Sequence, residues 1–214
     1  MAISSGNKDF DEIINGGYDN CITTFYGSAG TGKTTFCLMA AIEQTKYNNK
    51  VIFIDTESNF SIERIKIICQ NKLENILGRI ILFKVKSFKI QQDQIKNLFN
   101  LINVGNFSLI IVDSIGHYYR SLVKKKPDLA NKMLISQLKM LKKISEKQPV
   151  VITNQVYTDI DKNIVRMLGR SIVGGYSTYI INLDKSDRRK LIVKKPLKRE
   201  SFFQIVDQGI KILK

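Results

Sequence analysis

The chain has 214 residues, and its 34 lysines and arginines against 19 aspartates and glutamates give a formal net charge of +15. At about 150 residues per domain this length favours one domain, and a hydrophobic content of 43% excludes a mainly disordered chain. The sequence has no run of about 18 apolar residues that could cross a membrane, no apolar signal-peptide core, and an odd number of cysteines without C-x-x-C spacing, so we expect free thiols in a reducing cytosol.

Strand-like and helix-like segments alternate over the first 155 residues. Short, almost wholly apolar runs are typical of strands buried on both faces, and they lie at Cys21–Tyr26, Lys50–Ile54, Ile80–Val85, Ser108–Val112 and Pro149–Thr153. Segments with a helical period lie between them, at Lys33–Thr45, Ile62–Lys72, Gln91–Ile102 and Asp128–Glu146. This alternation predicts an α/β fold with a mainly parallel central sheet and helices on both faces.

The pattern changes after Gln155. The segment Val156–Gly175 is polar, contains glycines and has no strong period, so we expect a loop region. Three shorter strands are predicted at Tyr176–Asn182, Lys190–Lys194 and Ser201–Val206, as an antiparallel C-terminal extension of the same sheet. No linker is visible, so we expect a single domain over residues 1–214.

A complete phosphate-binding loop follows the first predicted strand. The pattern G-x-x-x-x-G-K-[ST] is met by Gly27, Ser28, Ala29, Gly30, Thr31, Gly32, Lys33 and Thr34. Its backbone N–H groups and the following helix N-terminus suit ATP phosphates. We expect Lys33 to reach the β- and γ-phosphates, Thr34 to bind Mg²⁺, and Thr35 to complete the nucleotide site. The alternative is a chance glycine-rich turn, which the flanking strand and helix disfavour.

Three polar residues follow the ends of other predicted strands. Asp113 ends an apolar strand and is expected to support Mg²⁺ through a water molecule. Glu57 lies just beyond the second strand, where it could orient the attacking water, although an ordinary solvated loop carboxylate is the alternative. Asp55, nearer the strand, fits a structural role. Gln155 ends a further strand and could sense the γ-phosphate, although alone it is an ordinary loop glutamine.

Taken in order, these motifs resemble the RecA-type recombinase ATPases. The shared features are the phosphate-binding loop, a strand ending in Asp-Thr-Glu, a strand ending in Asp-Ser, and Ile-Thr-Asn-Gln-Val. Further matches lie at Ser4–Gly17, Phe60–Ile65, Tyr119–Arg120, Val173–Gly175 and Phe203–Ile210. The resemblance runs from about Ile3 to Ile210 and is nearest to the RadA branch. Within that branch the archaeal RadB paralogues fit best, because Asn-Gln-Val-Tyr is typical of them and because we expect no helix-hairpin-helix domain before the core.

The resemblance implies roles that the motifs alone do not. Glu57 would be the catalytic base, and Gln155 would couple the γ-phosphate to the loop that follows it. Arg64 would stack on adenine, which suits a planar guanidinium. ATP would lie at the edge of the domain, where a second copy could contact it. Two loops, Ser121–Asp128 and Val156–Val173, would face DNA.

The sequence also departs from full recombinases. The first of these loops is shorter and holds Lys124, Lys125 and Lys126 in place of a Gly-Arg-Gly turn. We expect no Phe-x-x-Ala segment before the core, so filament formation and strand exchange are not expected, although a homo-oligomer remains open. The resemblance to RadB proteins implies DNA binding with at most weak ATPase activity.

The positive charge has two interpretations. A pI near 9.7 favours a nucleic-acid partner, whereas the richness in Lys, Ile and Asn together also fits codon bias. Basic residues gather in the two expected DNA loops and in Asp184–Glu200, where eight basic residues stand against three acidic ones. A solvated turn is the alternative for that last segment. The predicted DNA contacts are Arg120, Lys124, Lys125, Lys126, Lys162, Arg166, Arg170, Arg188 and Arg189.

Three tyrosines lie near the second expected DNA loop. Tyr157 could stack on exposed bases, whereas packing is favoured for Tyr176 and Tyr179. The single histidine, His117, has no partner at ligand spacing and is expected to be structural.

The sequence thus predicts a cytoplasmic, nucleoid-associated protein that binds ATP, Mg²⁺ and DNA and acts in recombinational repair. Possible protein partners are a RadA-type recombinase or a structure-specific nuclease, and no membrane partner is expected. A nucleotide-gated adaptor that works through protein contacts is the alternative. A small-molecule kinase of the P-loop class is a distant third, because the Ile-Thr-Asn-Gln-Val strand end has no role in such an enzyme.

Overall fold

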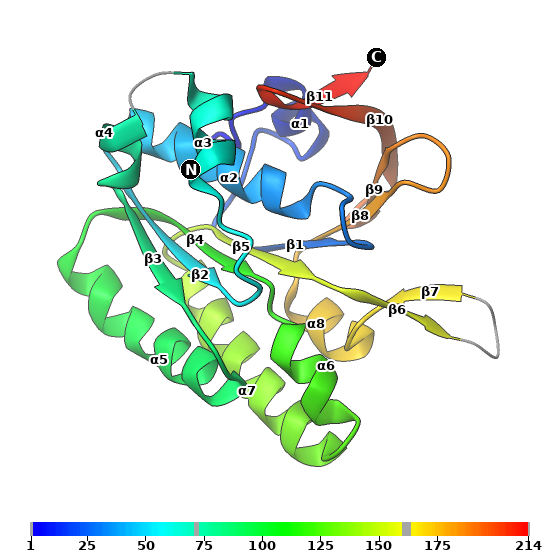
Figure 1. Ribbon diagram of the computed structural model, residues 1–214. Helices are drawn as coiled ribbons and strands as arrows, with labels where there is room; N and C mark the ends of the chain where they lie inside the picture. Colours follow the sequence, from blue (N-terminus) through cyan, green and yellow to red (C-terminus); the bar gives the residue numbers. More distant parts are fainter. Residues whose placement is uncertain (1, 71–72, 160–163, 214) are drawn as a thin grey trace.

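A sheet of nine strands forms the centre of the computed structural model within the described residues, 2–70, 73–159 and 164–213 (Figure 1). The strand order is β11-β10-β9-β8-β1-β5-β4-β2-β3. Six strands pair in parallel: β1 (Ile22–Tyr26), β2 (Lys50–Asp55), β3 (Ile80–Lys84), β4 (Phe107–Asp113), β5 (Val150–Asn154) and β8 (Tyr179–Asp184). An antiparallel extension follows from β9 (Lys190–Lys195), β10 (Arg199–Val206) and β11 (Gly209–Leu213).

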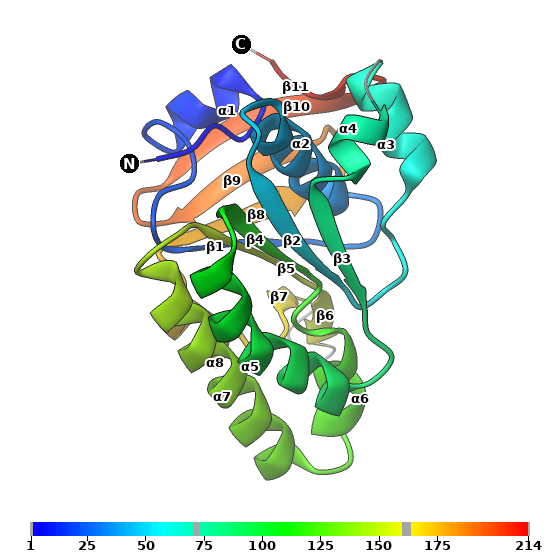
Figure 2. The same ribbon diagram turned by 90° about the vertical axis from the view of Figure 1, so that its left-hand side faces the viewer.

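Helices cover both faces of this sheet (Figures 1 and 2). One face carries α1 (Lys8–Ile13), α2 (Lys33–Lys46), α3 (Ile62–Cys69) and α4 (Leu73–Leu77). The other face carries α5 (Phe88–Val104), α6 (His117–Val123), α7 (Pro127–Ser145) and α8 (Arg170–Tyr176). The expected α/β architecture with a mainly parallel sheet and a C-terminal antiparallel extension is confirmed.

The two helical layers explain why the central strands are apolar throughout. In β2, Phe53 packs into the core under α2, whereas its neighbours Ile52 and Ile54 pack into the core under α5 and α7. Because successive side chains of a strand point to opposite faces, a strand covered on both sides needs apolar residues at every position.

The cysteines of this fold are not cross-linked. Cys21, Cys37 and Cys69 are free thiols, and the first two are buried. Packing, rather than cross-linking, therefore holds the layers together.

Over the part of the chain that the structure describes, each helix is too short or too polar to traverse a bilayer.

The C-terminal part differs from the sequence prediction in strand direction and bounds. The sequence predicts an antiparallel strand that begins at Tyr176, but Tyr176 is the last residue of α8. The strand, β8, begins at Tyr179 and runs parallel to β1. The physical reason is the crossover through α8, which returns the chain in the same direction, so antiparallel pairing begins only at β9.

The expected polar loop after Gln155 has regular structure. Strands β6 (Val156–Asp159) and β7 (Ile164–Met167) form an antiparallel hairpin, which extends away from the main sheet in Figure 1, and α8 follows it. Gly174 and Gly175 lower the helix propensity of α8, which explains why its sequence shows no helical signal. In the first expected DNA loop, α6 ends at Val123 and Pro127 opens α7, so only Lys124–Lys126 connect the helices.

The N-terminal segment is tied to the far end of the chain. Ile3 and Tyr18 exchange backbone hydrogen bonds of 2.8 Å, and the side chain of Asn7 donates to the Ile210 carbonyl in β11 at 2.6 Å. Arg199 of β10 donates to the Ile13 carbonyl at the end of α1, at 2.7 Å. These contacts join the first and last elements of the sequence into one layer.

Two adjacent glycines in this segment make a matched pair for a stability test. Both have positive φ, but a Cβ at Gly17 would lie 2.2 Å from the Ile3 carbonyl oxygen, whereas a Cβ at Gly16 would meet nothing within 4 Å. We expect Gly17→Ala to lower the free energy of unfolding by about 2 kcal/mol more than Gly16→Ala does, because only the former must displace backbone. Urea denaturation of both variants measures the difference, and equal losses would contradict the packing of Ile3 on Gly17.

Candidate nucleotide site and basic groove

The predicted nucleotide residues meet at one edge of the sheet. The parallel register pairs Tyr26 with Asn154 and Asp55 with Asp113, so β1, β2, β4 and β5 end at the same level. The phosphate-binding loop, the Asp-Thr-Glu segment, Asp113 and Gln155 each follow one of these ends. This common edge is where a parallel sheet places its ligands.

The phosphate-binding loop requires glycine at two tight positions. A Cβ at Gly27 would lie 2.2 Å from the Leu183 carbonyl oxygen of β8, and Gly32, at φ 103°, caps α2 in the left-handed region. Ser28, Ala29 and Gly30 form the exposed crest of the loop, and the buried Thr31 hydroxyl donates to the Ser28 carbonyl at 2.9 Å. The close approach of Gly27 to β8 and the hydrogen bond of Thr31 therefore fix the inner side of the loop, and its crest stays exposed to solvent.

Lys33 folds back over this loop. Its ammonium donates to the carbonyls of Gly27 and Ser28, both at 2.9 Å. Burial lowers the pKa of the Lys33 ammonium, while Asp113 and Glu57 act in the opposite direction. A phosphate arriving at the loop would offer this ammonium a stronger acceptor than two carbonyls.

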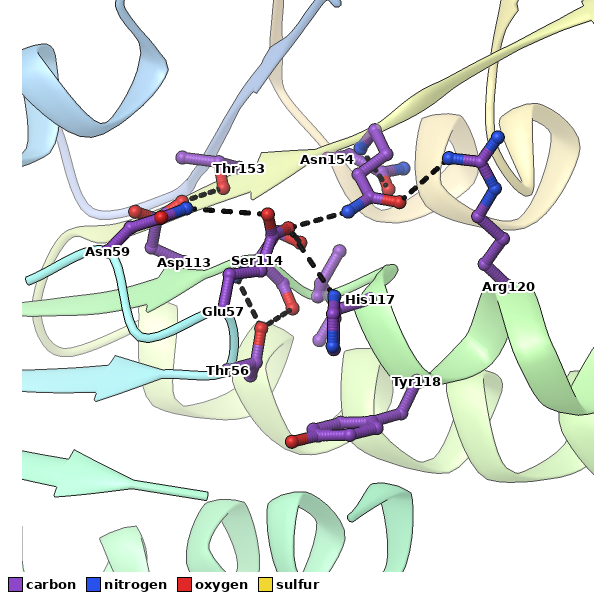
Figure 3. Close-up of polar contacts among 12 residues, drawn as sticks. Thr56, Glu57, Asn59, Asp113, Ser114, His117, Tyr118, Arg120, Thr153 and Asn154 are labelled. Carbon is purple, nitrogen blue, oxygen red and sulfur yellow. Dashed lines mark hydrogen bonds and ion pairs between the residues drawn. The ribbon is translucent and has the colours of Figure 1, made fainter. Parts of the chain in front are cut away.

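Asp113 and Thr34 form a pair suited to a hard cation. The Thr34 hydroxyl donates to Asp113 Oδ2 at 2.7 Å. The Thr153 hydroxyl donates to Asp113 Oδ1 (Figure 3). Burial raises the pKa of the Asp113 carboxyl, and the hydrogen bonds from Thr153 and Thr34 oppose that shift. A hydroxyl and a carboxylate oxygen side by side match the oxygen ligands that Mg²⁺ prefers, so the residues fit the expected ion. Thr35 follows in the first turn of α2 and is half-buried.

Asp55 shapes the segment that presents Glu57. Its carboxylate accepts from the backbone N–H groups of Glu57, Asn59 and Phe60 at 3.1 to 3.2 Å. Asp55 is itself buried at the end of β2. The carboxylate is therefore used to fold the turn, which leaves Glu57 as the carboxylate that faces the edge.

Glu57 is held by several donors. Its Oε1 accepts from the Ser114 hydroxyl and from Gln155 Nε2, the latter at 2.8 Å, and its Oε2 accepts from Asn59 Nδ2 at 3.4 Å. His117 Nδ1 lies 3.9 Å from Oε1 (Figure 3). The spacing of His117 in the sequence predicts only a structural role, because nothing local shows that α6 begins beside Glu57.

Gln155 also connects the nucleotide edge to α6. While its Nε2 donates to Glu57, its Oε1 accepts from Arg120 Nη1 at 3.2 Å. The residues form a continuous chain, Arg120 to Gln155 to Glu57. A predicted DNA contact is thus joined to the predicted catalytic carboxylate through the one residue expected to couple them.

Arg64 lies at a different boundary of the site. Its Nη2 donates to the Val206 carbonyl at the end of β10, at 2.7 Å, and its backbone N–H is capped by Ser61. The guanidinium therefore joins α3 to the turn between β10 and β11. Its stacking on adenine stays a prediction.

A basic groove opens beyond Arg120. A cavity of about 690 Å³ lies between α6, the β6–β7 hairpin and the start of α8. It is lined by Tyr119, Arg120, Val123, Lys124, Tyr157, Thr158, Arg166, Leu168, Gly169, Arg170 and Ser171. The structure thus brings together four predicted DNA-contacting cations and the tyrosine proposed to stack.

The remaining predicted DNA contacts are more scattered. Lys125 and Lys126 are exposed beside the groove without lining it, and Lys162 falls outside the described residues. Tyr176 and Tyr179 pack against the two cores, as favoured from the sequence.

The segment Asp184–Glu200 is less of a free cationic surface than its composition indicates. Lys190 and Lys198 both pair with Glu200, whose pKa these lysines lower. Lys195 donates to the Ser177 carbonyl at 2.6 Å, and Arg189 donates to the Gly30 carbonyl of the phosphate-binding loop at 2.7 Å. Arg188 is exposed. Sequence alone gave no sign that Arg189 reaches the nucleotide loop, because the contact depends on β8 lying beside β1.

The chain is similar in sequence to a group of known proteins. The sequence model of the Rad51 family matches residues 1–212. The DNA repair and recombination protein RadB of Methanococcoides burtonii is 37% identical over 85% of this chain and 82% of its own length. The proteins of the same name from Methanoculleus marisnigri, 32% identical over 98% and 97%, and Archaeoglobus fulgidus, 34% identical over 99% and 98%, match nearly end to end. The chain therefore belongs to the Rad51 family of RecA-type proteins and is similar to the archaeal RadB proteins, as its motifs indicated.

Proposed function

We propose that this chain is an ATP- and DNA-binding recombinase paralogue that acts in DNA repair and homologous recombination. The observation that carries the proposal is the chain of contacts from Arg120 through Gln155 to Glu57, because it links a basic groove to a phosphate-binding edge. The names of the relatives, DNA repair and recombination proteins, support it. We place the protein in the cytoplasm, at the nucleoid.

At the nucleotide edge each residue has a distinct task. Lys33 and the backbone of Gly27–Thr34 bind the phosphates of ATP, and Thr34 with Asp113 holds the metal ion. Mg²⁺, when bound there, neutralises charge on the phosphates. Glu57 orients the attacking water and accepts its proton, and Gln155 transmits the state of the γ-phosphate to the hairpin that follows it.

We infer that hydrolysis is slow in this resting arrangement. Glu57 Oε1 already accepts from Ser114 and Gln155, and Oε2 accepts from Asn59. Each carboxylate oxygen can accept two hydrogen bonds, so Oε1 has none free, and an attacking water must use the remaining site of Oε2 or wait for the release of Ser114 or Gln155 from Oε1. DNA phosphates that compete for Arg120 would loosen Gln155 and start that release.

We do not assign strand exchange to this chain. The connection between α6 and α7 consists of Lys124–Lys126 alone, without the Gly-Arg-Gly turn that the resemblance to full recombinases would require. We propose instead that the chain supports a RadA-type recombinase or a structure-specific nuclease. A homo-oligomer is compatible with this role, whereas a filament is not part of the proposal.

The hydrogen bonds that Glu57 already accepts also favour a second function. A protein that binds ATP without turning it over would serve as a nucleotide-gated adaptor that works through protein contacts. DNA binding discriminates between the two functions, because an adaptor of this kind does not need the basic groove. A mobility-shift assay at low salt that detects no DNA complex would favour the adaptor.

The nucleotide site is tested by Lys33→Ala. We expect this variant to lose ATP binding by at least about 100-fold while it keeps its fold, because the ammonium makes charge-assisted contacts with phosphate. Fluorescence titration with a labelled ATP analogue measures affinity, and circular dichroism checks the fold. Lys46→Ala, at the exposed end of the same helix, is the control. Nucleotide binding that survives Lys33→Ala would refute the assignment.

The groove is tested by a double variant, Lys124→Gln with Arg170→Gln. Each cation that contacts a phosphate of single-stranded DNA contributes about 0.7 to the slope of log affinity against log salt, so we expect that slope to fall by about 1.4. Lys132→Gln with Lys139→Gln removes the same charge from the exposed side of α7 and should leave the slope unchanged. Equal effects of the two double variants would mean that net charge, rather than the groove, binds DNA.

The restraint on Glu57 is tested by Ser114→Ala. Loss of one hydrogen bond of about 1 kcal/mol frees one acceptor site of Oε1, to which Gln155 still donates, and should raise kcat for ATP hydrolysis about fivefold, with little change in KM. Steady-state assays should include Glu57→Gln, which we expect to be inactive, and Ser136→Ala on α7 as a control. A kcat for Ser114→Ala equal to or below that of the unchanged protein would show that the contact does not restrain turnover.

A further inference from the structure

The turn between β8 and β9 lies directly beside the phosphate-binding loop. Strand β8 pairs in parallel with β1, with Asn182 opposite Tyr26, so both strands end at the same edge. The approach is close enough that a Cβ at Gly27 would lie 2.2 Å from the Leu183 carbonyl oxygen. Residues that follow β8 are therefore neighbours of the loop that binds phosphate.

The turn is fixed in this position by its own polar contacts. The Asp184 carboxylate accepts from the backbone N–H groups of Lys185 and Ser186 at 2.8 and 3.2 Å, and from the Ser186 hydroxyl at 2.8 Å. At the other end of the turn, Arg189 Nη1 donates to the Gly30 carbonyl at 2.7 Å. The acidic residue at the start of the turn is thus used internally, and a cation secures its end to the loop.

Lys185 is the residue left facing the loop. Its Nζ lies 3.4 Å from the position that a Cβ would take at Gly30, the exposed crest of the loop. Within the described ranges, no hydrogen-bond acceptor or carboxylate partner is found for this ammonium. Lys185 also acts to lower the pKa of Lys33, as expected for two ammonium groups drawn to one loop.

Three cationic side chains therefore lie at the phosphate-binding loop: Lys33, Lys185 and Arg189. The surrounding surface offers them little negative charge. Asp113 and Glu57, the carboxylates that act on Lys33, already accept hydrogen bonds from other side chains, and Asp184 is used inside the turn. Like charges held this close are unfavourable unless an anion joins them. None of Asp184–Lys190 lines the basic groove, so the turn belongs to the nucleotide edge rather than to the predicted DNA surface.

We propose that Lys185 is a further phosphate-binding residue, which contacts the polyphosphate chain of the nucleotide held by the P-loop of the same molecule. Arg189 is a positioning residue that keeps the turn, and with it Lys185, against Gly30. This inference rests on the proposed ATP-binding function. Lys185 is thereby assigned to the nucleotide, although it lies in Asp184–Glu200, a segment that the sequence predicts to contact DNA.

The test compares nucleotide with inorganic tripolyphosphate, which carries the phosphates without the base. Lys185→Gln should weaken both a labelled ATP analogue in direct titration and tripolyphosphate in competition about tenfold, as for the loss of one charge-assisted hydrogen bond. Lys185→Arg should restore most of the affinity. Lys132→Gln, which removes the same charge from the exposed side of α7, should bind both ligands as the unchanged protein does.

The positioning role of Arg189 has its own readout. If Arg189 acts through Lys185, the effect of Lys185→Gln should shrink when it is measured in the Arg189→Gln variant, because the turn is no longer held in place. Additive effects of the two changes would refute the positioning role. Thermal unfolding without nucleotide checks that each variant is folded.

Two results would overturn the proposal for Lys185. One is unchanged affinity of Lys185→Gln for both the ATP analogue and tripolyphosphate. The other is weaker DNA binding by Lys185→Gln in the absence of nucleotide together with unchanged ATP affinity, which would return the residue to the DNA surface. Failure of the proposed function is distinct, since Lys33→Ala would then bind ATP as well as the unchanged protein does.

Discussion

Parallel pairing of β1 with β5 on one side and β8 on the other is the constraint on which the rest of the molecule depends. It brings the phosphate-binding loop, Gln155 and the β8–β9 turn to one level, although they are far apart in the sequence. Strand β4, which pairs with β5, adds Asp113 to the same edge. Without this register the residues would carry the same chemistry but could not share one ligand.

Hydrogen bonds at this edge join binding to response. Asp113 accepts hydrogen bonds from two hydroxyl groups, and Glu57 accepts hydrogen bonds from three side chains that follow the ends of β2, β4 and β5, so neither carboxylate is independent of its neighbours. The same Gln155 side chain that touches Glu57 accepts from Arg120 at the wall of the groove. This amide gives the proposed coupling between DNA and nucleotide a short and specific route.

The sequence predicts contiguous features well and features that depend on pairing poorly. The phosphate-binding loop and the apolar strands are local patterns, and the structure has them where they were expected. The direction of β8 and the contact of Arg189 with Gly30 follow from which strands become neighbours, and no local pattern encodes that. The composition of Asp184–Glu200 also indicates more free positive charge than the structure has there. Counting residues cannot show that Lys190 and Lys198 both pair with Glu200.

The ties between the first and last elements have a consequence for how the protein is made. Asn7 binds the carbonyl of Ile210, and Arg199 binds that of Ile13, so the layer around α1 is complete only when β10 and β11 are present. On a ribosome the chain emerges from its N-terminus, so α1 leaves the exit tunnel well before β10 and β11, which supply these partners. This layer therefore closes through contacts between residues that lie 203 and 186 positions apart, which are expected to form more slowly than local contacts.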